Sequence, residues 1–258
     1  MLQNDDNCNF AARGDSVRIC HVFVINRLPA AVDTPALHGK PHAAGRYCVP
    51  AAGTAPDPME SLNRAVFLAI NASPNVSEGE LALAVFLAKY LILLLPVGLV
   101  TLWLAGGRDR EGAVHGLLGV ALVLLVNFVV GLAWFEPRPF VVGLGTNLLA
   151  HAPTSAFPSN HASIMFTSAF VLMGTVARTP RLLGKLLLIC ALPVCWARVY
   201  LGVHWPVDML GGLCVSIVAA LVMRTAAARE TSRIAAAVLE GIYRRLLAWP
   251  IARGWLRR

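Results

Sequence analysis

The feature that most constrains this chain is a series of apolar runs, most of them as long as a membrane is thick. A helix needs about 20 residues to cross the hydrocarbon core of a bilayer. Runs of this kind occupy residues 81–105, 113–135, 161–177, 182–200 and 206–223. The third run is the shortest and least apolar, so we expect its neighbours to shelter it from lipid. The pattern predicts an all-α, polytopic membrane bundle of about five transmembrane helices, with interfacial helices beside it.

The composition favours lipid rather than water around these runs. Hydrophobic residues make up 57% of the 258 positions and charged residues only 14%, whereas a soluble domain is about half apolar and about a quarter charged. The net charge is +8, but most arginines lie in short loops between the runs or in the C-terminal tail. This placement is typical of cytoplasmic loops in a membrane protein. We therefore expect a membrane partner and no nucleic acid.

The basic residues also predict an orientation. Short connections follow the first and third runs, which forces antiparallel neighbours. On this topology one side of the bundle collects most of the basic residues, namely Arg108, Arg110, Arg178, Arg181, Lys185 and the tail from Arg224 onward. The positive-inside rule puts this side and the C-terminus in the cytoplasm, and the loop 136–160 outside.

The two ends of the chain differ from the apolar middle. Residues 1–58 contain no run that can cross a bilayer; they are either disordered or precede a physiological start at Met59, and we favour the second. Residues 59–225 form the predicted membrane domain, opened by a short amphipathic helix over 61–70. Residues 226–258 predict a basic amphipathic tail, which either lies on the inner leaflet or packs, solvated, on the bundle.

The six cysteines form no recognisable framework. No CxxC or metal-like Cys/His spacing occurs, which favours cysteine as a small buried hydrophobe. They are Cys8, Cys20, Cys48, Cys190, Cys195 and Cys214. We expect no structural disulfide and no zinc.

Three polar clusters collect at one predicted membrane face. They are EPRPF at 136–140, FPSNHAS at 157–163 and ARVYLGVHWPVD at 197–208. In an up-down bundle these three junctions share one side. Polar residues at membrane depth are costly, so such a concentration indicates a functional site.

The second cluster indicates an anion site. Ser159 and Asn160 precede a helix whose first N–H groups have no intrahelical partner, and these groups bind phosphate well. The alternative is plain N-capping by either side chain. His161 begins the same helix, where it can donate a proton to a leaving oxygen.

The other two clusters supply cations and a histidine–carboxylate pair. Arg138 and Arg198 offer planar donors for phosphate oxygens, although arginine also anchors helices at interfaces. His204 and Asp208 lie four residues apart around the start of a helix, with Pro206 at its first position. Asp208 can accept one ring N–H of His204 and strengthen the imidazole as a nucleophile. Such a pair is also a common structural contact.

These residues together resemble one family, the type-2 phosphatidic acid phosphatase superfamily. Its pattern RP, PSxH and R-x5-H-x3-D is met by Arg138-Pro139, by Pro158-Ser159-Asn160-His161, and by Arg198 with His204 and Asp208. Within the superfamily the chain looks like the bacitracin-resistance type of undecaprenyl-diphosphate phosphatase, on the stretches LNRAVFLAIN, FLAKYLI, FPSNHAS and RVYLGVHWPVDMLGG. The resemblance covers the chain from residue 59 to the C-terminus.

The resemblance implies a reaction without a metal or cofactor. His204, oriented by Asp208, attacks the terminal phosphorus and forms a phosphohistidine, and His161 protonates the leaving lipid phosphate. The oxygens are held by Arg138, Arg198, Ser159 and Asn160. The implied substrate is undecaprenyl diphosphate, a polyprenyl diphosphate lipid of the bacterial inner membrane. Its hydrolysis to undecaprenyl phosphate recycles the cell-wall lipid carrier and confers bacitracin resistance.

Two positions depart from the family's pattern. The first motif begins with a lysine where this chain has Gly131, and the third opens with serine where this chain has Ala197. Lys89, inside the first apolar run, either supplies the missing charge to the phosphate, neutralises Glu136 or extends outward.

Other functions share parts of this pattern. A phosphatase of phosphatidic acid or phosphatidylglycerol phosphate would use the same pocket. A transporter or structural membrane protein would line a pathway with the polar clusters and would need no nucleophile. A haloperoxidase shares the oxyanion pocket but is usually soluble, and the apolar runs argue against it.

Overall fold

The computed structural model describes residues 19–20, 48–49 and 57–255. The chain splits into two units, Met1–Asp57 and Pro58–Arg258. In the first unit, strand β1 (Ile19–Cys20) pairs antiparallel with strand β2 (Cys48–Val49). The predictions of disorder or a late start over residues 1–58, and those for the cysteine side chains of that region, fall outside the described residues.

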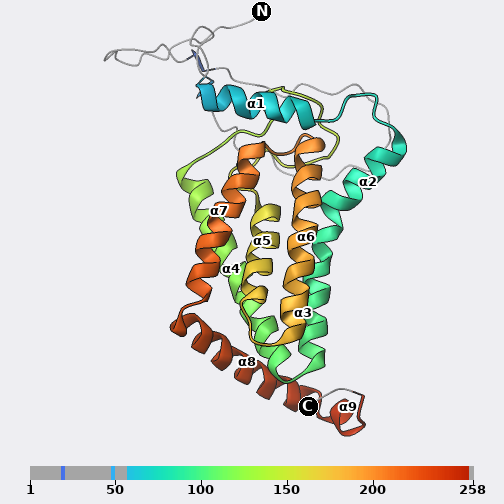
Figure 1. The fold of residues 1–258 in the computed structure, drawn as a ribbon, viewed down its shortest axis with the longest axis vertical. Helices are drawn as coiled ribbons and strands as arrows, with labels where there is room; N and C mark the ends of the chain where they lie inside the picture. The colour runs from blue at the N-terminus through green and yellow to red at the C-terminus, as the bar shows by residue number, and fades with distance from the viewer. Residues whose placement is uncertain (1–18, 21–47, 50–56, 256–258) are drawn as a thin grey trace, which may run out of the picture. The chain divides into compact units, whose positions relative to one another are not determined.

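The second unit is all-α, as the apolar runs predict (Figure 1). Its helices are α1 (Pro58–Ile70), α2 (Glu78–Lys89), the short 3-10 helix η1 (Leu91–Leu93), α3 (Leu94–Ala105), α4 (Arg108–Ala133), α5 (Asn160–Met173), α6 (Arg178–Tyr200), α7 (Pro206–Met223), α8 (Ala226–Leu246) and α9 (Ala248–Ala252).

Four helical stretches of the described residues are long and apolar enough to cross a membrane. They are Glu78–Ala105, Arg108–Ala133, Arg178–Tyr200 and Pro206–Met223. The first combines α2, η1 and α3, and its α-helix is interrupted at η1, which contains the residue four positions before Pro96, Ile92. Proline cannot donate to the carbonyl four residues earlier and its ring clashes there, which accounts for the interruption of the α-helix.

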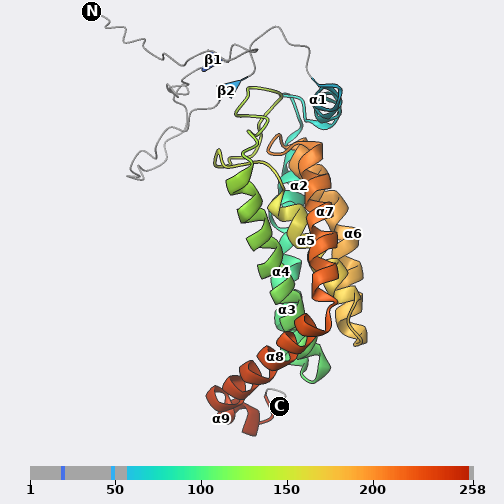
Figure 2. The ribbon, with the colours of Figure 1, turned by 90° about the vertical axis from the view of Figure 1, so that its left-hand side faces the viewer.

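The third predicted span, residues 161–177, is shorter than we expected. Helix α5 has 14 residues, or about 21 Å at 1.5 Å per residue, and Gly174 ends it. It is therefore not among the helices long enough to span. Instead α5 packs against α4, α6 and α7 and is enclosed by them (Figures 1 and 2). The expected shelter from lipid is present.

Glycines on the neighbouring helices bring α5 to the centre of the bundle. A Cβ at Gly184 of α6 would lie 2.7 Å from the carbonyl oxygen of Ala169. A Cβ at Gly212 of α7 would lie 2.8 Å from the Cβ of Ala162. Small residues at such contacts are typical of membrane helix packing. This packing sets the start of α5 beside the start of α7.

One end of the bundle is covered by α1 and by the connection 134–159 between α4 and α5 (Figure 1). The predicted amphipathic helix over 61–70 is the larger part of α1. Its Phe67 is fully buried and packs on Trp205, with ring centroids 5.1 Å apart. The Asn63 side chain accepts a hydrogen bond from the backbone N–H of Val207 at 3.1 Å. These contacts hold the loop before α7 in place.

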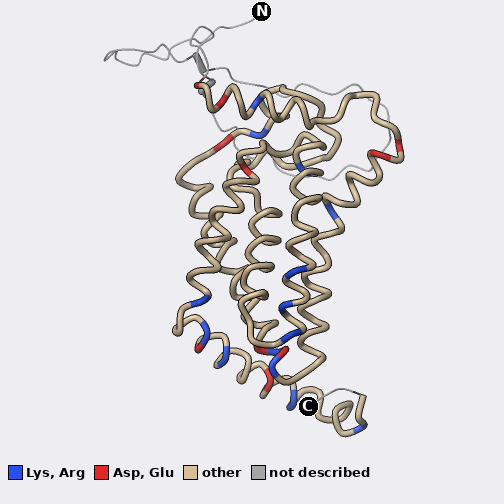
Figure 3. Tube along the Cα trace, in the orientation of Figure 1, with Lys and Arg blue, Asp and Glu red and all other residues tan. Residues whose placement is uncertain are grey.

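The other end carries most of the basic residues and helix α8 (Figures 1 and 3). Buried Arg110 on α4 donates to Glu240 of α8 at 2.6 Å and lies over the ring of Tyr243. The His115 ring and the Ser232 hydroxyl are 2.7 Å apart. An apolar row on α8 stays exposed, formed by Ile234, Val238, Ile242 and Leu246. The tail therefore packs on the bundle and still presents an apolar face.

Candidate active site

A buried histidine–carboxylate pair lies where α7 begins. His204 Nδ1 is 3.0 Å from Asp208 Oδ2, and the side chains are 2% and 0% exposed. The same oxygen accepts the backbone N–H of Trp205 at 2.8 Å. Pro206 starts the helix, as predicted from its fixed φ. The predicted contact between the two side chains is thus present.

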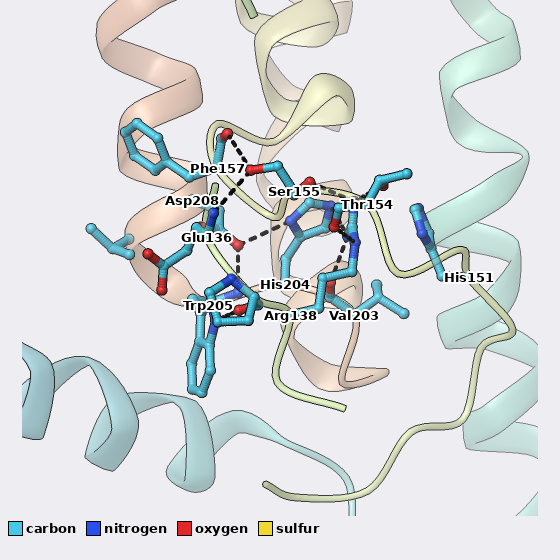
Figure 4. A network of polar contacts seen from close by, with 12 residues as sticks. Glu136, Arg138, His151, Thr154, Ser155, Phe157, Val203, His204, Trp205 and Asp208 are labelled. Atoms are coloured by element: carbon cyan, nitrogen blue, oxygen red, sulfur yellow. Dashed lines mark hydrogen bonds and ion pairs between the residues drawn. The ribbon is translucent and has the colours of Figure 1, made fainter. Parts of the chain in front are cut away.

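The partners of His204 determine its tautomer. Its Nε2 lies 3.1 Å from Nη1 of Arg138 (Figure 4). A guanidinium only donates, so Nε2 must accept, and Nδ1 carries the hydrogen that faces Asp208. The Nε2 lone pair therefore points at a cation rather than at the carboxylate. This is the arrangement that a nucleophilic imidazole needs beside an anionic substrate.

Arg138 is held by the connection between α4 and α5. It donates to the carbonyl oxygens of Thr154 at 3.0 Å, Ser155 at 3.1 Å and Val203 at 2.8 Å, and to the Thr154 hydroxyl at 3.2 Å. The side chain is 4% exposed. Its charge is balanced mainly by carbonyl dipoles, so it retains attraction for an anion.

Arg198 supplies unpaired donors beside this pair. It lies near the end of α6 and is 3% exposed. Its Nε and Nη2 are buried without a hydrogen-bond partner, and so is the hydroxyl of Ser159. Buried polar atoms without partners are rare and need an explanation. A bound oxyanion would satisfy all of these donors at once.

The start of α5 is the place where the sequence predicted an anion site. Ser159 occupies the N-cap position, but its side chain makes no capping hydrogen bond, so plain capping does not account for it. The first N–H groups of a helix have no intrahelical partner. His161 lies on the first turn and is half-buried. The exposed Asn160 accepts a hydrogen bond from Asn127 Nδ2 at 2.8 Å.

Burial and positive charge shape the titration of the groups outside the spans. Burial lowers the pKa of His204 well below its usual value, and Arg138, Arg198, His151 and His161 lower it further. Burial also lowers the pKa of Arg138 to about 10. At neutral pH His204 is thus uncharged while Arg138 stays charged.

The sequence reasoning missed two residues at this site. Asn127 is 5% exposed and lies near the end of α4, where it contacts Asn160. The sequence feature that could have identified Asn127 is an amide side chain inside an otherwise apolar run. His151 lies in the connection 134–159, with its ring centroid 6.2 Å from that of His204. Its signal was weak, because nothing in the local sequence separates it from an ordinary loop histidine.

One predicted site residue does not join the cluster. Lys89 is exposed at the end of α2, and no hydrogen bond or ion pair links it to the site within the part of the chain that the structure describes. The position of the missing lysine, Gly131, is roomy: a Cβ there would meet only the Cβ of Ser155, at 3.9 Å. No charged side chain of the described residues lies within 4 Å of that Cβ.

The remaining predicted residues converge from three parts of the chain. Arg138 comes from the connection after α4, His161 and its neighbours come from the start of α5, and Arg198, His204 and Asp208 come from the region where α6 ends and α7 begins. Two arginines, a helix N-terminus and a neutral imidazole whose lone pair faces a guanidinium can bind a phosphoryl group and attack it. The described residues contain no group of three or more His, Cys, Asp or Glu side chains that could hold a metal.

Comparisons with known proteins point to one family. Residues 112–232 match the PAP2 superfamily. The chain is 36% identical over 207 residues to YbjG of Escherichia coli, to which an undecaprenyl-diphosphatase activity has been assigned provisionally. That match covers 77% of this chain and 99% of YbjG.

Two further proteins are similar to this chain. The undecaprenyl-diphosphatase BcrC of Bacillus subtilis is 32% identical over 159 residues, which cover 61% of this chain and 80% of BcrC. The crystal structure of Aquifex aeolicus LpxE superposes with a TM-score of 0.48 at 22% identity, over 62% of this chain and 93% of LpxE.

Proposed function

The chain belongs to the PAP2 superfamily and is a lipid phosphatase of that type, and we propose that its substrate is undecaprenyl diphosphate. The products would be undecaprenyl phosphate and inorganic phosphate. The observation that carries this proposal is the set of buried polar atoms at the site that lack a partner among the described residues. The Nε2 lone pair of His204 faces a guanidinium, and Arg198 and Ser159 keep buried polar atoms without partners. An anion with several oxygens supplies what these groups lack.

In the first step of the proposed reaction His204 is the nucleophile. The substrate's terminal phosphate displaces the Arg138 donor from Nε2 and takes its hydrogen bonds. The Nε2 lone pair then forms a bond to phosphorus, and the bond from phosphorus to the bridging oxygen breaks. Burial, together with Arg198, His151 and Arg138, lowers the pKa of the free His161 to about 3, so its ring takes up a proton once the anionic substrate binds beside it. His161 then gives this proton to the bridging oxygen, which leaves with the electron pair as undecaprenyl phosphate. Asp208 stabilises the positive imidazole ring through Nδ1–H.

The second step restores the enzyme. Water attacks the phosphohistidine, the phosphorus–nitrogen bond breaks, and its electron pair returns to Nε2 of His204. The neutral His161 accepts the proton of the water. Arg138, Arg198 and the N–H groups at the start of α5 hold the equatorial oxygens in both steps, so that charge stabilisation supplies most of the acceleration.

The substrate can be tested directly. Purified full-length protein would be offered undecaprenyl diphosphate, phosphatidic acid and phosphatidylglycerol phosphate side by side, and phosphate release would be measured. We expect the fastest release from undecaprenyl diphosphate. Faster release from either glycerolipid would assign this site to that lipid instead. No release from any of them would remove the phosphatase assignment.

The proposed cellular setting follows from the charge distribution. The chain is a multi-pass membrane protein. We place the arginine-rich end and α8 at the cytoplasmic face of the bacterial inner membrane, with the exposed apolar row of α8 against the inner leaflet. The site then faces the exterior, where it would recycle the lipid carrier and confer bacitracin resistance. Growth at raised bacitracin concentration in a strain lacking its own phosphatases would test this role.

Activity is expected to survive removal of divalent metals. In the proposed site Arg138 and Arg198 provide the positive charge that a metal ion provides elsewhere, so chelation removes nothing from it. We expect phosphate release to change by less than about twofold after dialysis against EDTA. Loss of release in EDTA, restored by added magnesium, would contradict this mechanism.

Lys89 is expected to be dispensable, because the structure leaves it exposed and outside the cluster. Lys89→Met should retain phosphate release within about twofold, as surface substitutions usually do. Lys185→Met, an exposed lysine at the other end of the bundle, is the matched control. A loss of activity much larger for the first variant than for the second would make Lys89 the missing phosphate ligand.

A further inference from the structure

The third histidine at the site, His151, has no part in the reaction described above. It lies in the connection 134–159, and its ring stands at 76° to the ring of His204 with centroids 6.2 Å apart. Figure 4 shows it beside the guanidinium of Arg138. It is half-buried, whereas Arg138 and Arg198 are nearly fully buried. His151 therefore lies at the rim of the site, nearer the protein surface than the two arginines.

The backbone orients the His151 ring. Its Nδ1 lies 2.9 Å from the carbonyl oxygen of Ala152. A carbonyl only accepts, so Nδ1 carries the hydrogen and Nε2 is left for another partner. No hydrogen bond to Nε2 occurs among the residues that the structure describes. The ring orientation is therefore fixed, and its Nε2 is available to a ligand.

The charges around His151 favour an anionic ligand. Burial lowers its pKa, and Arg138 and Arg198 lower it further, whereas the hydrogen bond to Ala152 raises it. The free imidazole is therefore neutral at pH 7. A phosphate anion beside Nε2 favours the protonated ring, which then donates a charge-assisted hydrogen bond to a phosphate oxygen. Binding of the phosphate therefore favours protonation of His151, and the protonated ring in turn binds the phosphate more strongly.

The cationic and imidazole groups of the site differ in burial, and this difference matches the two phosphates of a diphosphate: Arg138 and Arg198 are buried, whereas His151 is half-buried. The terminal phosphorus must sit beside Nε2 of His204, among the buried arginines. In an in-line displacement the leaving oxygen lies opposite the nucleophile, so the second phosphate extends away from His204 toward the rim. His151 is too far from His204 for a direct hydrogen bond and close enough to contact the same substrate.

From this placement we propose that His151 is a specificity-determining residue that binds the inner phosphate of a diphosphate, the one that stays on the lipid. The inference rests on the proposed phosphatase function. A phosphate monoester has no second phosphate and gains nothing from His151. The residue would thus separate diphosphate from monophosphate substrates, while the groups around His204 act on both.

Two soluble probes test this proposal without relying on the lipid chain. Inorganic diphosphate and inorganic phosphate would each be used to inhibit dephosphorylation of undecaprenyl diphosphate, followed by the lipid product. For His151→Ala we expect the inhibition constant of diphosphate to rise about tenfold or more, since a charge-assisted hydrogen bond is lost. The constant for phosphate should stay within about twofold, because monophosphate does not reach the rim. His151→Gln, which keeps an N–H donor, should recover part of the affinity for diphosphate.

Asn147→Ala is the matched control, because Asn147 is exposed on the same connection and caps only the backbone N–H of Leu149. It should change neither inhibition constant. Equal losses of affinity for both probes in His151→Ala would mean that His151 only supports the shape of the site, and no change for either would show that it does not contact the ligand. Either result overturns the proposal. Failure of the phosphatase function itself would appear separately, as absence of product with the wild-type chain.

Discussion

Replacing His204 is expected to abolish phosphate release, with kcat lower by about a thousandfold or more, because the proposed reaction proceeds through a bond from its Nε2 to phosphorus. His204→Gln is the better variant than His204→Ala. Glutamine keeps most of the volume of this 2% exposed side chain and an N–H for Asp208. The measurement is the rate of phosphate release, together with the thermal unfolding midpoint that shows whether the fold is retained.

Trapping the phosphohistidine tests directly whether His204 forms the covalent intermediate. With a labelled terminal phosphate, rapid quenching in base should leave label on the wild-type protein and none on His204→Gln. His115→Gln, a half-buried histidine at the other end of α4, is the control and should be labelled like the wild type. Release by His204→Gln within about tenfold of wild type would require another nucleophile. Full function without His204 would favour a transporter.

Replacing Arg198 with methionine is expected to separate activity from stability. The buried donors of Arg198 have no partner without substrate, and a buried, unpaired cation destabilises the folded state. Arg198→Met should therefore unfold at the same or a higher temperature than the wild type. Its kcat/KM should fall by about a hundredfold to a thousandfold, as when a donor to the transition state is removed. Arg198→Lys should not restore activity, because an ammonium cannot reproduce the planar fork.

Arg181→Met provides the comparison, since Arg181 is exposed on the same helix α6. It should keep both activity and thermal stability. Inorganic phosphate should raise the unfolding temperature of the wild type and not that of Arg198→Met, because only a ligand bound to the folded state stabilises it. A variant at position 198 that loses stability and activity together would show that Arg198 holds the bundle rather than the substrate.

Much of the fold follows from the sequence because a lipid environment restricts the conformations that the backbone can adopt. A backbone in hydrocarbon must satisfy its own hydrogen bonds, so long apolar runs become helices, and short connections make them antiparallel. The positions of the polar clusters at helix junctions then follow from chain order. Helix α5 was the exception: length and hydropathy suggested a span, but its central place depends on Gly184 and Gly212 of other helices.

The chemical groups of the site could also be proposed from the sequence, because His204 and Asp208 are one helical turn apart and local spacing brings them together. Hydrogen bonds between residues far apart in the sequence could not be found in this way. Asn127 reaches Asn160 across 33 positions, and Arg138 reaches His204 across 66. Lys89, a candidate by its place in an apolar run, is exposed in the structure.

The sequence by itself determined that the chain is a helical membrane protein and which junctions carry its polar groups, because these properties depend on hydrophobicity and local spacing. Only the tertiary structure decided which ring nitrogen of His204 faces Arg138 and which donors of Arg198 lack a partner. It also decided that His151 lies at the rim of the site. Those features depend on how separate helices and one long connection pack, and packing is a property of the whole bundle.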